Sequence, residues 1–146
     1  MTARRQRLAA FIDSVWNEGD AAAVAEFLAP RYTIRHDPGD PWEGQVLDHE
    51  GFAERLALSR APFPDQRFEI LAMFEDETGI AMTWNWSATH LGEIAGFAPT
   101  GRTIRMSGAT VYAFDGENRL TGHWQVADRL SVFHQLQAGA AAGSTG

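Results

Sequence analysis

The chain has 146 residues, a length typical of one domain, and 45% of them are hydrophobic, so it can form a core without a disulfide or a structural metal. It contains no cysteine and no lysine, which excludes thiolate nucleophiles and Schiff-base chemistry on a lysine amine. A net charge of −7 disfavours binding to nucleic acid or to an anionic membrane surface.

The hydropathy pattern predicts neither a membrane-spanning segment nor a signal peptide. No apolar run approaches the roughly 18 residues of a membrane span. The first apolar stretch, residues 8–12, is followed at once by Asp13, so it is too short for the core of a signal peptide. We therefore expect a cytoplasmic protein.

The N-terminal part of the chain predicts three helices. Gly19 is a natural end for the first of them, Asp20 can cap a second short helix that ends at Pro30, and Asp48 can cap a third that closes at Pro62. The apolar face of the first helix consists of residues spaced three and four apart: Leu8, Phe11, Ile12, Val15 and Trp16.

The rest of the chain reads as strands. A short strand is expected from Tyr32 to His36, followed by a proline- and glycine-rich loop from Asp37 to Gly44. The long strands are expected at residues 67–74, 80–90, 102–114 and 120–128. A terminal helical turn is expected from Leu130 to Leu136, and a disordered tail at residues 138–146.

This order of elements predicts an α+β fold made of a single domain, residues 1–137. Three helices cannot cover both faces of such a sheet. We therefore expect a curved antiparallel sheet wrapped around the three N-terminal helices, a cone-shaped α+β barrel with a hollow between its layers. The uncovered sheet face would need a partner, which predicts a homodimer or a homotetramer.

The last long strand ends in a carboxylate that could do chemistry. Alternate residues of a strand share a face, so Asp128 lies on the same side as Trp124 and Val126. Loss of hydration against such apolar walls raises the pKa of a carboxyl group from about 3.9, which makes it a usable general base. The alternative is that Asp128 caps the turn that begins at Leu130.

The histidines divide between pocket and surface positions. His90 shares a strand face with Trp84 and Trp86, and His36 ends the first strand. Both are candidate pocket residues. His123 lies on the face opposite Asp128 and is expected at the sheet surface or at a dimer interface. The set His36, Asp37, Asp40 and His49 has no recognised ligand spacing, so no metal site is expected.

Five segments of the sequence occur in an order that resembles a known family. They are Tyr-Thr-Ile-Arg-His-Asp-Pro (32–38), Ala-Pro-Phe-Pro-Asp (61–65), Thr-His-Leu-Gly-Glu (89–93), Phe-Ala-Pro-Thr-Gly-Arg (97–102) and His-Trp-Gln-Val-Ala-Asp (123–128). Together, over residues 8–137, they resemble the SnoaL-like polyketide cyclases, or ester cyclases.

The resemblance implies the cone fold of ketosteroid isomerases and limonene epoxide hydrolases. It also implies a cofactor-free intramolecular aldol condensation that closes a ring of an apolar or aromatic polyketide ester, as in antibiotic biosynthesis. The family's acid–base aspartate corresponds to Asp128, four residues after Trp124, and its pocket histidines correspond to His36 and His90. A further family histidine, on the third long strand, has no counterpart here; Tyr112 is the hydroxyl available on that strand.

The sequence thus predicts that Asp128 removes a C–H proton between two carbonyls and returns it to the new alkoxide, with His36 and His90 orienting the carbonyls. The planar substrate would bind against four aromatic residues, Trp84, Trp86, Tyr112 and Trp124.

Three alternatives stay open. The first is another enzyme on the same scaffold, such as an isomerase, a hydratase or a cofactor-free hydroxylase. The second is a non-catalytic dimeric module that binds lipophilic molecules. The third is a protein that degrades or senses small aromatics.

Overall fold

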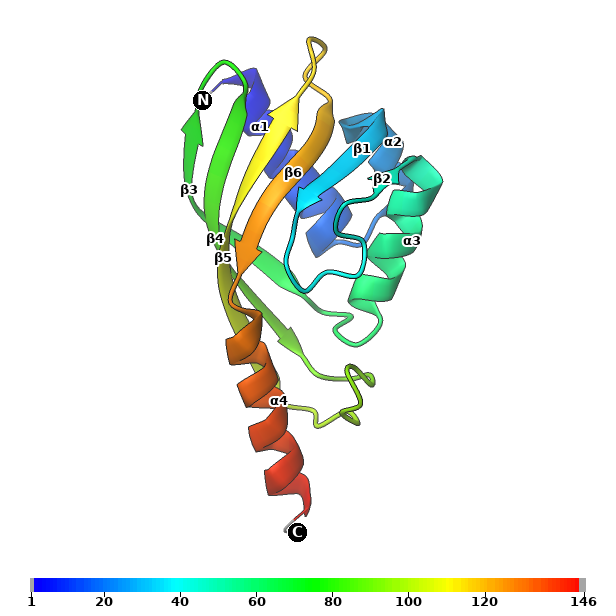
Figure 1. The fold of residues 1–146 in the computed structure, drawn as a ribbon, viewed down its shortest axis with the longest axis vertical. Coiled ribbons are helices and arrows are strands. Elements are labelled where there is room, and N and C mark those ends of the chain that lie inside the picture. Colours follow the sequence, from blue (N-terminus) through cyan, green and yellow to red (C-terminus); the bar gives the residue numbers. More distant parts are fainter. Residues whose placement is uncertain (1, 145–146) are drawn as a thin grey trace.

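The computed structural model describes residues 2–144, and the fold is an open, curved sheet with helices packed on one face (Figure 1). The helical segments are α1 (Ala3–Phe11), η1 (Ile12–Asn17), η2 (Ala21–Ala23), α2 (Val24–Phe27), α3 (His49–Arg60) and α4 (Arg129–Ser144). The strands are β1 (Leu28–His36), β2 (Val46–Leu47), β3 (Arg67–Glu75), β4 (Gly79–Thr89), β5 (Thr103–Phe114) and β6 (Leu120–Ala127). The predicted α+β class, with a curved sheet around the N-terminal helices, is confirmed.

No helix within residues 2–144 is long and apolar enough to cross a membrane.

The N-terminal helices form as their sequence pattern predicts. Thr2 caps α1 by accepting a hydrogen bond from the backbone N–H of Arg5, and Asp20 caps η2 in the same way. Gly19 takes a positive φ of 73° where the chain turns between them. The whole predicted stripe of the first helix is buried in the core: Leu8, Phe11, Ile12, Val15 and Trp16.

The strand order in the sheet is β2-β1-β6-β5-β4-β3. β1 runs parallel to β6, and the other neighbouring pairs are antiparallel. The two parallel strands approach so closely that a Cβ on Gly122 would overlap the carbonyl oxygen of Thr33, which explains the glycine at that position. This close pairing brings His36, at the end of β1, beside Trp124 in the middle of β6, 88 residues later in the chain.

The register of the sheet determines which strand faces point to the helices. Trp84 and Trp86 on β4 are buried on the inner face, as predicted. On β6, His123 lies directly opposite Tyr112 of β5, so these two residues share the inner face. Trp124 therefore points outward and is 44% exposed. The expectation that His123 lies at the surface is wrong, because the pairing with β5 turns the other face of β6 outward.

The C-terminal helix is longer than the sequence predicts. α4 continues to Ser144 and projects beyond the sheet (Figure 1), so the part of the expected disordered tail that the structure describes is helical. The alanines at 138 and 140–142 favour a helix, and Gly139 lies against the side chains of Thr100 and Arg102. Residues 145–146 of the expected tail lie outside the described residues.

Candidate active site

An internal cavity of about 130 Å³ lies between the inner face of the sheet and the helices. Aromatic side chains form its walls, and charged and amide side chains gather at one end. The lining residues are Trp16, Tyr32, Asp40, Arg55, Ser59, Gln66, Phe68, Trp84, Trp86, Met106, Tyr112, His123, Gln125 and Arg129. Apolar walls with a few convergent polar groups are typical of a small-molecule site.

Asp37 does not line the cavity itself but is hydrogen-bonded to His123 and Gln125, two residues of its polar end. It follows the last residue of β1, where the pairing of His36 with Trp124 sets it beside β6. Its side chain is fully buried and accepts hydrogen bonds from His123 Nε2 at 2.9 Å and from Arg129 Nη1 at 2.9 Å. Burial alone would raise the pKa of Asp37, but the hydrogen bond from His123 and the charge of Arg129 outweigh burial and hold this pKa below its ordinary value. Asp37 is therefore ionised at neutral pH.

His123 links Asp37 to a buried phenol. Its Nδ1 lies 2.6 Å from the hydroxyl oxygen of Tyr32. An ionised Asp37 can only accept, so Nε2 of His123 carries the proton and Nδ1 accepts from the Tyr32 hydroxyl. Burial lowers the pKa of His123 from 6.5 by more than the hydrogen bond to Asp37 raises it, and burial raises the pKa of Tyr32 well above 10. At neutral pH His123 is thus a neutral imidazole with a free-base nitrogen directed at a phenol.

The charged side chains around His123 and Asp37 balance one another. Arg55 Nη2 lies 2.8 Å from Asp40 Oδ2 and 3.5 Å from Asp37 Oδ2. Two carboxylates and two guanidinium groups therefore share the polar end, and three of the four side chains are at most 8% exposed; the exception is Arg129, which is 32% exposed. Because each buried charge has an opposite partner, the cluster can persist inside the fold.

A second chain of hydrogen bonds connects the aromatic wall to Asp37. The indole N–H of Trp84 donates to Thr110 Oγ1 at 2.9 Å, and the Thr110 hydroxyl donates to Gln125 Oε1 at 2.7 Å. The Gln125 amide then donates to Asp37 Oδ1 at 3.3 Å. Trp84 is also held from behind, since a Cβ on Gly108 would overlap its indole ring. The wall is thus rigidly tied to the polar end.

Among residues 2–144, the histidine and carboxylate side chains form no group of three or more that could hold a metal ion.

Comparison with protein-family models matches residues 6–136 to the SnoaL-like polyketide cyclase family. The chain belongs to this family. A crystal structure of a proposed polyketide cyclase from Acidithiobacillus ferrooxidans is 52% identical, with a TM-score of 0.90 over 96% of this chain and 100% of that one. IdmH, a proposed polyketide cyclase from Streptomyces antibioticus, is 26% identical, with a TM-score of 0.78 over 93% and 99% of the two chains.

More distant structures share the SnoaL-like fold alone. AclR, a proposed hydroxylase from Streptomyces galilaeus, is 19% identical, with a TM-score of 0.74 over 94% of this chain and 83% of that one. No curated protein matches the chain. Membership of the SnoaL-like family suggests an enzyme, most simply a cyclase.

Three of the aromatic residues that the sequence predicts for substrate binding meet in this cavity. Trp84 and Trp86 line it from β4, and Tyr112 lines it from β5. The fourth, Trp124, lies on the outer face of β6. It stacks there on His36, with the ring centres 4.7 Å apart and the planes at 11°. His36 and Trp124 are therefore separated from the cavity by the sheet.

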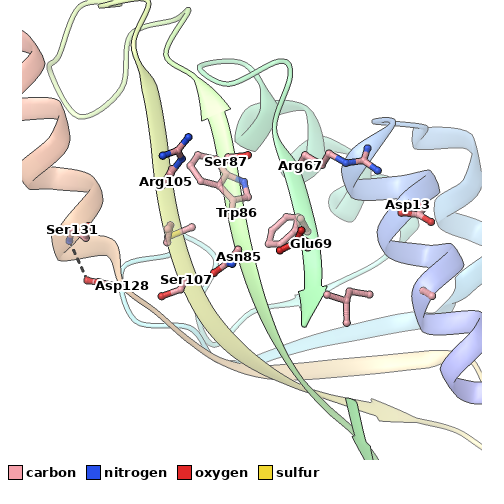
Figure 2. A pocket seen from close by; sticks show the side chains of 14 residues that line it. Asp13, Arg67, Glu69, Asn85, Trp86, Ser87, Arg105, Ser107, Asp128 and Ser131 are labelled. Carbon is pink, nitrogen blue, oxygen red and sulfur yellow. Dashed lines mark hydrogen bonds between the residues drawn. The ribbon is translucent and has the colours of Figure 1, made fainter. Parts of the chain in front are cut away.

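The predicted acid–base residue also lies away from the cavity. Asp128 is the N-cap of α4 and accepts a hydrogen bond from the backbone N–H of Ser131 at 3.1 Å. It borders an open groove of about 760 Å³ that crosses β3, β4 and β5 between α1 and α4, beside Ser107 and Asn85 (Figure 2). The alternative role that the sequence left open, a helix cap, is the one that the structure shows.

His90 is buried but does not line the cavity. It is 0% exposed, and its Nδ1 lies 3.1 Å from the hydroxyl of Thr100, in the segment that joins β4 and β5. The structure therefore does not bring Asp128, His36 and His90 together in the cavity.

The sequence pattern does not identify the residues at the polar end. It favours the outer face for His123 because Trp124, on the other face of β6, resembles pocket lining. It offers Asp37 only as a member of a metal-ligand set without recognised spacing. The available signal was a histidine and a glutamine, His123 and Gln125, at alternate positions of a strand, since such residues on an inner face must find polar partners.

The placement of Asp128 leads to a first prediction. Asp128→Asn should leave any turnover unchanged and alter the free energy of unfolding little, because asparagine is an equally good N-cap, whereas Asp128→Ala should cost about 1 kcal/mol. Urea unfolding of both variants measures this. Loss of turnover in Asp128→Asn, with the fold intact, would restore the catalytic role that the sequence predicts.

Proposed function

We propose that the chain is a polyketide cyclase that closes a ring by an intramolecular aldol reaction, with His123 as the acid–base group in place of Asp128. One observation carries the proposal: a neutral imidazole, backed by an ionised carboxylate and facing a phenol, lines a cavity with aromatic walls. A base backed by a carboxylate in this way can accept a proton because the charge that forms on it is stabilised.

The proposed reaction uses these groups in order. Nδ1 of His123 removes a proton from a carbon between two carbonyls, and the C–H electrons form an enolate. The hydroxyl of Tyr32 turns from Nδ1 to the enolate oxygen and donates a hydrogen bond to it. The enolate carbon attacks a second carbonyl of the same molecule, which forms the carbon–carbon bond and an alkoxide. The imidazolium returns its proton to that alkoxide, and no other reactant is consumed.

Each supporting residue has a defined part in this scheme. Asp37 stabilises the imidazolium through its hydrogen bond to Nε2. Trp84 and Trp86 provide flat walls that favour a planar conjugated chain. The rigid wall holds the two reacting carbons in one geometry, which is the main advantage for an intramolecular reaction.

The volume of the cavity limits what can enter. About 130 Å³ is well below the roughly 300 Å³ of a typical small-molecule site. We therefore infer that the reacting part of a narrow, extended chain occupies the cavity, and that the rest of the substrate stays outside.

The test of this function measures proton removal, since that step needs no knowledge of the natural substrate. Methyl acetoacetate deuterated at C2 is incubated in H2O near pH 7, and loss of deuterium is followed by NMR. The protein should accelerate this loss above the rate in buffer. A protein that binds the ester and leaves the exchange rate unchanged would instead be a non-catalytic binding module. An isomerase or a hydratase would share the proton removal, and no particular contact favours either.

We further propose that the outer sheet face is the contact of a homodimer. Phe74, Ala81, Val111 and Trp124 lie directly opposite one another on β3, β4, β5 and β6 and form an apolar row across the sheet. Three of them are large side chains that are 44–66% exposed. The double substitution Phe74→Arg and Val111→Arg should halve the mass measured by light scattering. A wild-type protein that is already monomeric would contradict this proposal.

A further inference from the structure

Gln66 uses only the oxygen of its side-chain amide for hydrogen bonding within the described residues. It lies between α3 and β3, is 4% exposed, and lines the cavity. Its Oε1 accepts a hydrogen bond from the indole N–H of Trp86 at 2.8 Å. An indole N–H can only donate, so this bond determines which end of the amide is oxygen. The Nε2 group therefore points away from Trp86.

Nε2 of Gln66 has no hydrogen-bond partner among residues 2–144, although it is fully buried. A buried donor without a partner destabilises a fold, and buried amides are nearly always satisfied. If Gln66 only filled space, an apolar residue would do so without the free-energy cost of a buried, unpaired donor. The unused donor therefore points to an acceptor that is present only when a ligand occupies the cavity.

Gln66 and His123 lie at opposite ends of the cavity. Trp86, which Gln66 holds, pairs with Met106 of β5, whereas His123 pairs with Tyr112 of the same strand. These two positions on β5 are six residues apart, so the two side chains reach the cavity at different points along the strand. A ligand that contacts both residues must carry an oxygen apart from the carbon that loses its proton.

We propose that Gln66 is a positioning residue that donates a hydrogen bond from Nε2 to a carbonyl oxygen remote from the reacting carbon, and so determines which carbonyl lies at His123. A chain with regularly spaced carbonyls could otherwise slide along the apolar walls. One fixed donor at the far end selects a single register and thereby a single ring size. The inference rests on the proposed function in taking the cavity as the substrate site.

The test compares two linear probes of equal length, 2-octanone and 2,7-octanedione, which differ by one carbonyl. Binding is measured by the fluorescence of the tryptophans that line the cavity. Wild-type protein should bind the diketone about tenfold more tightly, the effect of one buried hydrogen bond. In Gln66→Met this ratio should fall to about one. The matched control, Gln6→Met on the exposed face of α1, should keep the wild-type ratio.

A second variant separates the donor from the packing of Trp86. Gln66→Glu keeps an oxygen that can accept from the indole N–H and removes both amide hydrogens, so it should also lose the preference for the diketone. Near-UV circular dichroism checks that the tryptophans remain packed. A preference that persists in both variants, or its absence from the wild type, would overturn the proposal.

The binding test of Gln66 can be read separately from the deuterium-exchange test of the proposed function. If the wild type shows the preference and loses it in both variants while deuterium exchange stays at the buffer rate, the proposed function fails and the role of Gln66 in binding stands. If exchange is accelerated but the variants keep the preference, the function stands and the role of Gln66 fails.

Discussion

Replacing His123 by asparagine is expected to slow enzymatic proton removal by a factor of about 10² to 10⁴, the usual contribution of a general base. Asparagine can still donate a hydrogen bond toward Asp37, but it has no basic nitrogen to take a proton from carbon. The structure supports this loss because Nδ1 of His123, at 2.6 Å from the Tyr32 hydroxyl, is the basic nitrogen that lines the cavity. Deuterium loss from the labelled keto ester measures it.

The pH profile of the same reaction provides an independent check. The neutral imidazole is the active form, and burial holds the pKa of His123 below 6.5. The rate should therefore be constant near pH 7 and fall only in more acidic solution, with the midpoint below 6.5. His134→Asn, at an exposed position of α4, is the matched control and should keep the wild-type rate and profile. Full activity in His123→Asn would show that another group is the base.

Replacing Asp37 by alanine is expected to destabilise the protein by about 3–5 kcal/mol, the cost of removing one member of a buried ion cluster. The change leaves Nε2 of His123 without its acceptor and takes a close partner from Arg129. The free energy of unfolding in urea measures the loss. Glu54→Ala, at an exposed position of α3, should change it by less than about 0.5 kcal/mol.

Lowering the pH should reduce the free energy of unfolding in two steps, the first from His123 and the second from Asp37. His123 has a lowered pKa in the folded state, so the unfolded chain takes up its proton first, and stability should begin to fall as the pH drops below about 6.5. Asp37 also has a lowered pKa, so its contribution is complete above about 3.8 and is lost as the pH falls through its folded pKa. Asp37→Ala should make the second decline smaller, while Asp65, Asp76 and Asp115, whose pKa values are also lowered, continue to contribute to it. An Asp37→Ala variant as stable as wild type would mean that the cluster contributes no net stabilisation.

Much of the fold could be predicted from local pattern. The helical stripe from Leu8 to Trp16 is buried because residues three and four apart must share one face. The alternation on β4 correctly predicts that Trp84 and Trp86 are buried, because the residues of the opposite face, Thr83, Asn85 and Ser87, are polar. The resemblance to the SnoaL-like family came from short segments whose order, rather than any one of them, is specific.

The site itself depends on tertiary structure. Alternation divides β6 into two faces, but both faces carry a ring and a polar group, so pattern alone could not say whether His123 or Trp124 points inward. The pairing of His123 with Tyr112 decided it. The parallel pairing of β1 with β6 then placed Asp37 beside His123. The sequence by itself determined which residue types were available for acid–base chemistry; only the register between distant strands decided which of them meet, because register follows from the packing of the whole sheet against the helices.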